Sequence, residues 1–339
     1  MLKMYHQRAH KGDSPDLWEE NWENDNFEEA LRFCETDPLR ALFERYARPG
    51  MAMLEGGCGH GQYVAYYGAR GVRVVGLDFA QSALLRLHER NQNLMLCSGN
   101  VAALPFRDEA FDLYYSGGVV EHFETGAEPA LHEARRVLRP GGVLLISVPY
   151  IGLLRRVLSP FRSSLWKRVA RAEVDAEKVG DGPRFFQYVY SRREFEKTLE
   201  AAGLRVIATQ GYGILWGLYD VALLQTLVEK LTQRSAGGPS PANAKSRNGS
   251  RAHVSLTDSN RKGGADVLLP VLNVESNASV SLLDSQVRSP SRSTIKRLII
   301  SEDDSVPVLG LGVRLMRWAC ANMMMYVCVC ATGSSEKAN

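Results

Sequence analysis

Apolar positions in the middle of the chain alternate between short β-type runs and stripes with helical spacing. These runs predict six strands, at Met51–Glu55, Val72–Leu77, Leu94–Cys97, Phe111–Tyr115, Val143–Val148 and Leu204–Thr209. The stripes between them predict helices that end near Ala69, Arg90, Leu138 and Ala202. Strands separated by helices of this length are typical of a parallel sheet with helices on both faces.

The N-terminal part of the chain has helical spacing only. We expect two helices within residues 16–47. Trp18 and Trp22 are four residues apart, so they share one face of the first helix. The pair Asp37-Pro38 suits the start of the second helix, because Asp is a good cap and Pro fits the first helical position.

After the sixth predicted strand the regular alternation stops. Residues 218–231 predict one amphipathic helix, and the segment that follows is rich in Ser, Gly, Asn and Pro. Such a segment buries too little apolar surface to offset its ordering entropy, so we expect it to be mostly disordered. A helix over 308–319 and a seventh strand over 323–329 follow. The predicted units are an N-terminal helical cap (1–48), a main domain (49–233), a disordered insertion (234–300), a return helix and last strand (301–331) and a flexible tail (332–339).

Composition narrows the class of protein. The 339 residues are 45% hydrophobic and 23% charged, which excludes a wholly disordered chain. The net charge is only +3, from 41 basic and 38 acidic residues, so we expect no nucleic-acid partner. The six cysteines form no CxxC motif, and we find neither an uninterrupted membrane-spanning run nor a secretory signal. We therefore expect a soluble cytoplasmic protein.

A glycine-rich loop directly follows the first predicted strand. Glycines let the backbone adopt positive φ and let a ligand approach the bare main chain. A phosphate loop would end in Gly-Lys-Ser/Thr, but here Gly61 is followed by Gln62 and Tyr63. A dinucleotide fingerprint needs a third glycine at the position of Gln62. The loop instead has the pattern acidic-x-Gly-x-Gly-x-Gly, with Glu55 as the acidic residue.

The series Glu55-x-Gly57-x-Gly59-x-Gly61 resembles the first motif of the class I S-adenosylmethionine-dependent methyltransferases. Further motifs of that family recur in order from residue 50 to 212, ending with Leu138-Arg139-Pro140-Gly141-Gly142 before the fifth strand. The resemblance implies a Rossmann-like, mostly parallel sheet of seven strands with the last strand antiparallel, an N-terminal helical cap and an inserted segment. It also implies S-adenosylmethionine as cofactor.

The resemblance also assigns roles to single residues. The acidic residue and the glycine loop would hold the amino-acid end of the cofactor, Asp78 the two ribose hydroxyls, and Asn100 the adenine amine. Read without the family, Asp78 could instead be an ordinary cap of the helix that follows it. The implied cofactor-binding residues are Glu55, Gly57, Cys58, Gly59, Gly61, Asp78, Phe79, Asn100 and Val101.

His122 is the candidate catalytic residue. It follows the fourth predicted strand at the edge of the sheet where ligands of open α/β folds bind, so it could act as a general base. The alternative is a histidine that only packs in the core. The segment Gly118–His122 is similar to the Glu-x-x-Glu-His metal site of ubiquinone-biosynthesis O-methyltransferases, but Gly118 replaces the first ligand. We therefore assign no metal.

The expected acceptor is a small molecule. Residues 151–171 combine many Arg and Lys with apolar and aromatic residues, which suits an anionic membrane surface or a lipid-like acceptor, or equally a solvated lid helix. The aromatic residues of 184–190 either wall the acceptor pocket or pack on the sheet. We expect methyl transfer to an O, C or N atom, with a lipid-like molecule or a quinone precursor among the candidates. The alternatives are a catalytically silent, partner-binding relative and, more remotely, a nicotinamide-dependent dehydrogenase.

Overall fold

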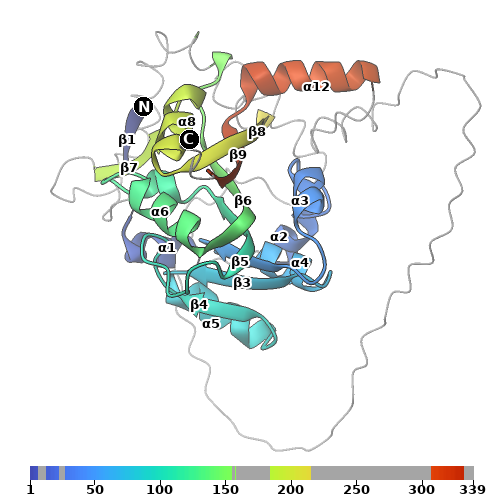
Figure 1. Cartoon of the computed structure of the whole chain (residues 1–339), viewed down its shortest axis with the longest axis vertical. Helices are drawn as coiled ribbons and strands as arrows, with labels where there is room; N and C mark the ends of the chain where they lie inside the picture. The colour runs from blue at the N-terminus through green and yellow to red at the C-terminus, as the bar shows by residue number, and fades with distance from the viewer. Residues whose placement is uncertain (7–12, 23–26, 155–156, 158–183, 215–306, 332–339) are drawn as a thin grey trace, which may run out of the picture.

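A computed structural model gives the structure of the protein and describes residues 1–6, 13–22, 27–154, 157, 184–214 and 307–331. Its centre is a seven-stranded sheet in the order β4-β3-β2-β5-β6-β9-β8 (Figure 1). The strands are β2 (Ala52–Gly56), β3 (Arg73–Asp78), β4 (Met95–Ser98), β5 (Phe111–Gly117), β6 (Leu138–Pro149), β8 (Leu204–Tyr212) and β9 (Met323–Cys330). Strand β9 is antiparallel to both β6 and β8, whereas the pairs from β4 through β6 are parallel. The predicted fold class is confirmed.

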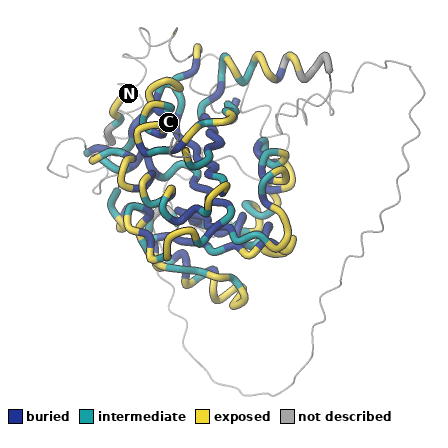
Figure 2. Tube along the Cα trace, viewed as in Figure 1, coloured by how far each residue is buried: buried dark blue, intermediate teal, exposed yellow. Residues whose placement is uncertain are grey.

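Helices cover the sheet on both faces. The main ones are α4 (Gln62–Gly68), α5 (Gln81–Arg90), α6 (Glu128–Val137) and α8 (Arg192–Ala201), while α12 (Pro307–Cys320) contacts the edge strand β8. Neighbouring residues on a strand point to opposite faces, so Leu54 packs in the cluster that contains α6 and α8, while Met53 packs with α4. Because the central strands are apolar on both sides, they are mostly buried (Figure 2).

The described residues of the N-terminal region form three short helices, so the prediction of two was wrong. They are α1 (Pro15–Asn21), α2 (Phe27–Phe33) and α3 (Arg40–Tyr46). The third begins two residues after Pro38, because Asp37 closes a turn there. Its side-chain Oδ1 accepts a hydrogen bond from the Leu39 N–H at 2.8 Å, and its carbonyl accepts one from the Arg40 N–H at 3.0 Å.

Strand β6 begins five residues earlier than expected. Phe111 of β5 pairs with Leu138, and the next regular pair joins Leu113 to Val143, so the register shifts between them. Helix α6 therefore leads straight into the strand, and the Pro-Gly-Gly sequence forms an irregularity within β6. Gly141 has a φ of +77°, which explains why a glycine occurs at this bend.

A second, two-stranded sheet was not predicted. Strand β1 (Leu2–His6) pairs antiparallel with β7 (Arg184–Val189), which lies more than 170 residues away in the chain. The aromatic residues Phe185 and Tyr188 of β7 are buried against the core on the α6 side. The sequence analysis left open whether the aromatic residues of 184–190 wall the acceptor pocket or pack on the sheet. For Phe185 and Tyr188, the structure shows packing in the core.

Several predicted features lie outside the described residues. These are the helix over 218–231, the low-complexity insertion over 234–300 and most of the basic stretch over 151–171. Within the part of the chain that the structure describes, no helix is long and apolar enough to cross a membrane.

Candidate cofactor and active site

A cavity of about 210 Å³ opens at the carboxyl ends of β2, β3 and β5. Strands β3 and β5 lie on opposite sides of β2, and in open α/β sheets ligands bind at such a reversal of strand order. The structure brings nine of the ten residues predicted from the sequence to this cavity: Glu55, Gly57, Cys58, Gly59, Asp78, Phe79, Asn100, Val101 and His122. Their roles toward a ligand stay predictions.

The glycine loop has the backbone shape that only glycine adopts easily. Gly57, Gly59 and Gly61 have φ values of +79°, +49° and +66°. A Cβ atom on Gly57 would lie 2.3 Å from Cγ2 of Val119, so a larger residue has no space there. Gly61 does not line the cavity. It directly precedes α4 and packs against Leu87, so it affects the conformation of the loop without facing the cavity.

Asp78 lies at the end of β3 and uses both carboxylate oxygens locally. Oδ2 accepts a hydrogen bond from the Gly59 N–H at 2.8 Å, and Oδ1 accepts one from the Ala80 N–H at 2.9 Å. Burial raises the pKa of Asp78, and these backbone donors oppose that rise. A carboxylate accepts about four hydrogen bonds, so the oxygens retain capacity for two hydroxyl donors. Asp78 thus stabilises the glycine loop through a hydrogen bond and is also a candidate ligand for the ribose.

Glu55 is buried at the end of β2, and its Oε2 has no hydrogen-bond partner among the described residues. Burial, and then the negative charge of Asp78, raise the pKa of Glu55 well above its usual range. A buried polar atom without a partner is costly, and a cationic ligand group would relieve that cost. An ammonium group bound here would favour the charged form of Glu55 and pair with it.

Asn100 lies on the other side of the cavity, in the loop after β4. It is exposed, and its Oδ1 accepts a hydrogen bond from the Ala102 N–H at 2.8 Å. The adjacent Val101 is buried in the wall. An amide side chain beside an apolar wall suits the edge and the face of a planar base.

His122 ends the short 3-10 helix η1 (Val120–His122), and its ring is buried. Nδ1 lies 2.9 Å from the carbonyl oxygen of Phe186. A carbonyl oxygen can only accept, so Nδ1 carries the proton and Nε2 is the basic nitrogen of the neutral ring. The ring also meets Trp18 edge-on, with centroids 4.8 Å apart. The packing role and the proposed base role are therefore compatible.

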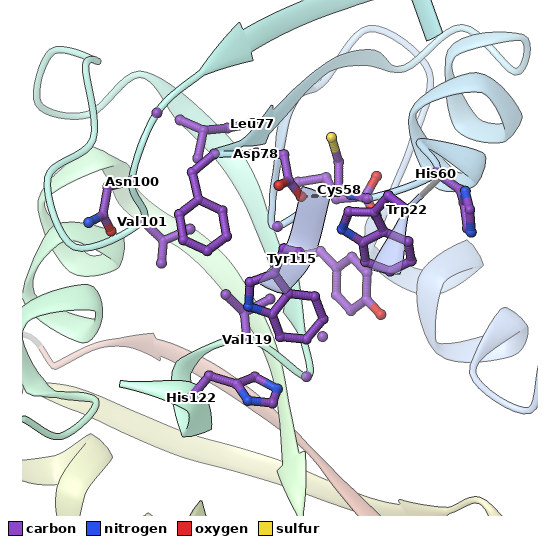
Figure 3. Close-up of a pocket in the computed structure, with 18 of the residues that line it drawn as sticks. Trp22, Cys58, His60, Leu77, Asp78, Asn100, Val101, Tyr115, Val119 and His122 are labelled. Atoms are coloured by element: carbon purple, nitrogen blue, oxygen red, sulfur yellow. Dashed lines mark hydrogen bonds between the residues drawn. The ribbon is translucent and has the colours of Figure 1, made fainter. Parts of the chain in front are cut away.

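Aromatic residues that the sequence analysis did not assign to the site form much of its wall. Figure 3 shows Trp22 and Tyr115 facing the hollow between Cys58 and His122. Tyr63 also lines the cavity, and its hydroxyl donates a hydrogen bond to the buried carboxylate of Asp37. The only indication of this aromatic wall in the sequence analysis was the four-residue spacing of Trp18 and Trp22, which places both on one helix face.

Glu121 lies beside the site but does not line the cavity. Its side chain is buried, its Oε2 has no hydrogen-bond partner among the described residues, and burial raises its pKa to about 8. Gly118 lines the cavity at the position where a third metal ligand would stand. In the described part of the chain, no group of three or more His, Cys, Asp or Glu side chains could hold a metal ion.

Comparisons with known proteins agree with this site. Residues 54–146 match the family model described as a methyltransferase domain. Over 129 residues the chain is 34% identical to a malonyl-(acyl-carrier protein) O-methyltransferase of Erwinia pyrifoliae, which covers 38% of this chain and 47% of that protein. Over 172 residues it is 31% identical to a protein of Mycolicibacterium smegmatis described as a probable S-adenosylmethionine-dependent methyltransferase, covering 50% and 59%.

Two further similarities involve a relative with lower coverage and a solved structure with lower sequence identity. The probable tRNA methyltransferase 9B of Homo sapiens is 37% identical over 113 residues, which is 33% of this chain and 24% of that protein. A solved S-adenosylmethionine-dependent methyltransferase of Aquifex aeolicus is 20% identical, with a TM-score of 0.41, and covers 59% of this chain and 93% of its own. The aligned segment spans about half the length of the first two relatives.

The strand order and the glycine loop define a cofactor-binding α/β domain of the class I methyltransferase type. Residues 54–146 are thus similar in sequence to S-adenosylmethionine-dependent methyltransferases, and S-adenosylmethionine is the cofactor that this similarity implies. The described residues fit it, because the unpartnered Oε2 of Glu55 and the side-chain-free surface at Gly57 suit its charged amino-acid end.

Proposed function

We propose that this protein transfers a methyl group from S-adenosylmethionine to an O, C or N atom of a small-molecule acceptor. The observation that carries the proposal is that Glu55, the glycine loop and Asp78 face one cavity, whose far wall holds His122. Because this cavity contains both a cofactor-type surface and a basic nitrogen, a bound acceptor would lie between them.

S-adenosylmethionine supplies an activated methyl group on a positively charged sulfur. The acceptor atom then displaces the sulfur in line, so the main task of the protein is to orient the two molecules. Holding reacting groups in the correct geometry corresponds to effective molarities on the order of 10⁵ M or more. Asp78 would fix the ribose and Glu55 the ammonium group, which together set the direction of the sulfur–methyl bond.

His122 is the residue that we propose to accept a proton from the acceptor. The Phe186 carbonyl holds the proton on Nδ1, which leaves Nε2 as the basic nitrogen. A hydroxyl acceptor needs such a base more than an amine does, so this arrangement favours an oxygen acceptor. The apolar neighbours Val119 and Phe123 also line the cavity, which supports a flat or lipid-like acceptor.

We also propose a cytoplasmic location and a peripheral contact of residues 151–171 with lipid. The first is supported by the six cysteines, which are all free thiols. The second is supported by the basic and apolar composition of that stretch. Binding of the purified chain to anionic vesicles, compared with neutral ones, tests the lipid contact.

The function is tested in two steps. Calorimetric titration with S-adenosylmethionine and NADH identifies the cofactor, and we expect binding of the first alone. Methyl-labelled S-adenosylmethionine is then incubated with panels of phenols, carboxylic acids, amines and quinone precursors, with and without the protein. Transfer of label supports the proposal. Binding of NADH alone would identify a dehydrogenase, whereas cofactor binding without transfer to any panel would favour the catalytically silent relative.

A further inference from the structure

The cavity has an unusual charge balance. Among the described residues that line it, three are acidic, namely Asp13, Glu55 and Asp78, and none is Lys or Arg. Arg86 does not line this cavity, and its guanidinium donates a hydrogen bond to the backbone carbonyl of Trp22. The described wall therefore favours a positively charged ligand over a neutral one.

Two indole rings complete this wall. The ring of Trp22 packs directly against the glycine loop. It lies so close to Gly59 that a Cβ atom added to this glycine would come within 2.8 Å of the ring. Trp22 stacks on Trp18 with centroids 5.9 Å apart and an interplanar angle of 27°. Trp18 in turn contacts the ring of His122. The indole pair thus lines the cavity from the cofactor loop to the proposed base, and Figure 3 labels Trp22 and His122 at the two ends.

Helix α1 is fixed in this position by polar contacts with α5. The carboxylate of Glu19 accepts a hydrogen bond from the Ser82 N–H at 3.1 Å, in the first turn of α5. The Arg86 side chain holds the end of α1 through the Trp22 carbonyl. The two rings are therefore held in place by the fold and do not depend on a ligand for their position.

The faces of indole rings attract cations more strongly than those of the other aromatic side chains. We propose that Trp18 and Trp22, within this acidic wall, make the site select the sulfonium form of the cofactor over its neutral product. This inference rests on the proposed function. In the transfer, a lone pair of the acceptor forms the bond to the methyl carbon. The electrons of the broken S–C bond return to sulfur, which becomes a neutral thioether.

Methyl transfer therefore removes the positive charge on the sulfur, which is the charge that the two indole rings and the acidic wall would attract. S-adenosylmethionine and S-adenosylhomocysteine share the ammonium, carboxylate, ribose and adenine groups, so their difference in affinity reports on the sulfur and its methyl group. We expect the wild-type protein to bind the sulfonium form about tenfold more tightly. Product release would then follow from the chemistry itself.

The test is calorimetric titration of the whole chain with S-adenosylmethionine, S-adenosylhomocysteine and sinefungin, which carries a protonated amine in place of the S-methyl group. Trp18→Leu should weaken binding of the two cationic ligands about five- to tenfold and binding of the neutral one less than about twofold. Trp18→Phe should fall between the two, because it keeps a weaker aromatic face. Trp318→Leu is the matched control, since Trp318 is exposed on α12 and does not line the cavity.

The outcomes separate this inference from the proposed function. If the wild-type protein binds all three ligands equally, or if Trp18→Leu weakens all three equally, the selection by charge is wrong while the function stands. If none of the three ligands binds, the proposed function itself fails. A Trp18→Leu variant that does not fold, as judged by circular dichroism, leaves Trp18→Phe and the wild-type affinity ratio to decide.

Discussion

Asp78 and Gly59 are joined by a hydrogen bond of 2.8 Å from the glycine N–H to Oδ2 of the carboxylate. This contact ties the end of β3 to the middle of the loop that follows β2. The residue expected to bind the ribose therefore also shapes the loop expected to hold the rest of the cofactor. Changes at Asp78 must affect both at once.

We expect Asp78→Asn to weaken binding of S-adenosylmethionine by roughly 1.5 to 3 kcal/mol. An amide has one acceptor oxygen, so it can keep the hydrogen bond from Gly59 or that from Ala80, but it turns N–H donors toward the other. Calorimetric titration measures the loss, and a melting curve checks that the variant is folded. An affinity within twofold of wild type would contradict the assignment of Asp78 to the cofactor.

The main sheet and the cofactor loop could be predicted because their signals are local. Strands such as Val72–Leu77 are short apolar runs, and Glu55 stands at a fixed distance from three glycines. Each of these patterns lies within about ten residues, so its meaning does not depend on the rest of the fold. The expected strands accordingly agree with the structure within two residues, except at the start of β6 and at the end of β8, which continues to Tyr212.

The parts that could not be predicted depend on contacts between distant residues. The pairing of β1 with β7 joins segments more than 170 residues apart in the chain and leaves no periodic pattern in either. The hydrogen bond from Tyr63 to Asp37 and the contact of Trp18 with His122 likewise exist only after folding. Trp18 and Trp22 were recognised as one helix face, but their spacing gave no indication of what that face covers.

A second prediction concerns the space beside the glycine loop. Gly57→Ala should abolish cofactor binding and lower the melting temperature, because the new methyl group would overlap Val119 and the residue would keep a positive φ. Gly141→Ala is the matched control: its φ is also positive, at +77°, but no atom lies within 4 Å of the added Cβ. We expect the control to lose only about 1 kcal/mol of stability and to bind the cofactor normally.

If both variants behave alike, backbone strain alone explains the loss and the overlap with Val119 is unimportant. A Gly57→Ala, Val119→Ala double variant distinguishes these cases further. It should regain part of the cofactor affinity if the clash is the cause, since the side chain that blocks the added methyl group is then smaller.

A third prediction follows from the buried carboxyl group of Glu121. Burial raises its pKa from 4.5 to about 8, so the folded protein binds a proton there that the unfolded chain releases between these pH values. The contribution of this group to stability is therefore fully present below about pH 4.5 and is lost as the pH rises through about 8. Glu121→Gln removes this dependence.

Between pH 5 and pH 8.5, the free energy of unfolding of Glu121→Gln should rise by roughly 4 kcal/mol relative to that of the wild type. Urea unfolding at half-unit steps of pH measures this change. Glu89→Gln is the control, because Glu89 is exposed on α5 and its replacement should leave the wild-type pH profile unchanged. Parallel profiles for Glu121→Gln and wild type would show that Glu121 is not protonated in the folded state.

The last prediction separates the catalytic role of His122 from its packing role. His122→Phe keeps an aromatic ring against Trp18 but removes the basic nitrogen, whereas His122→Ala removes both. If His122 accepts the proton, both variants should lower kcat by about 10²-fold or more with the identified acceptor, while the affinity for S-adenosylmethionine stays within about threefold in His122→Phe. His132→Ala, an exposed histidine on α6, should leave both quantities unchanged. Because a packing role depends on the ring and a base depends on the nitrogen, near-normal turnover in His122→Phe with a loss only in His122→Ala would assign His122 to the wall of the site.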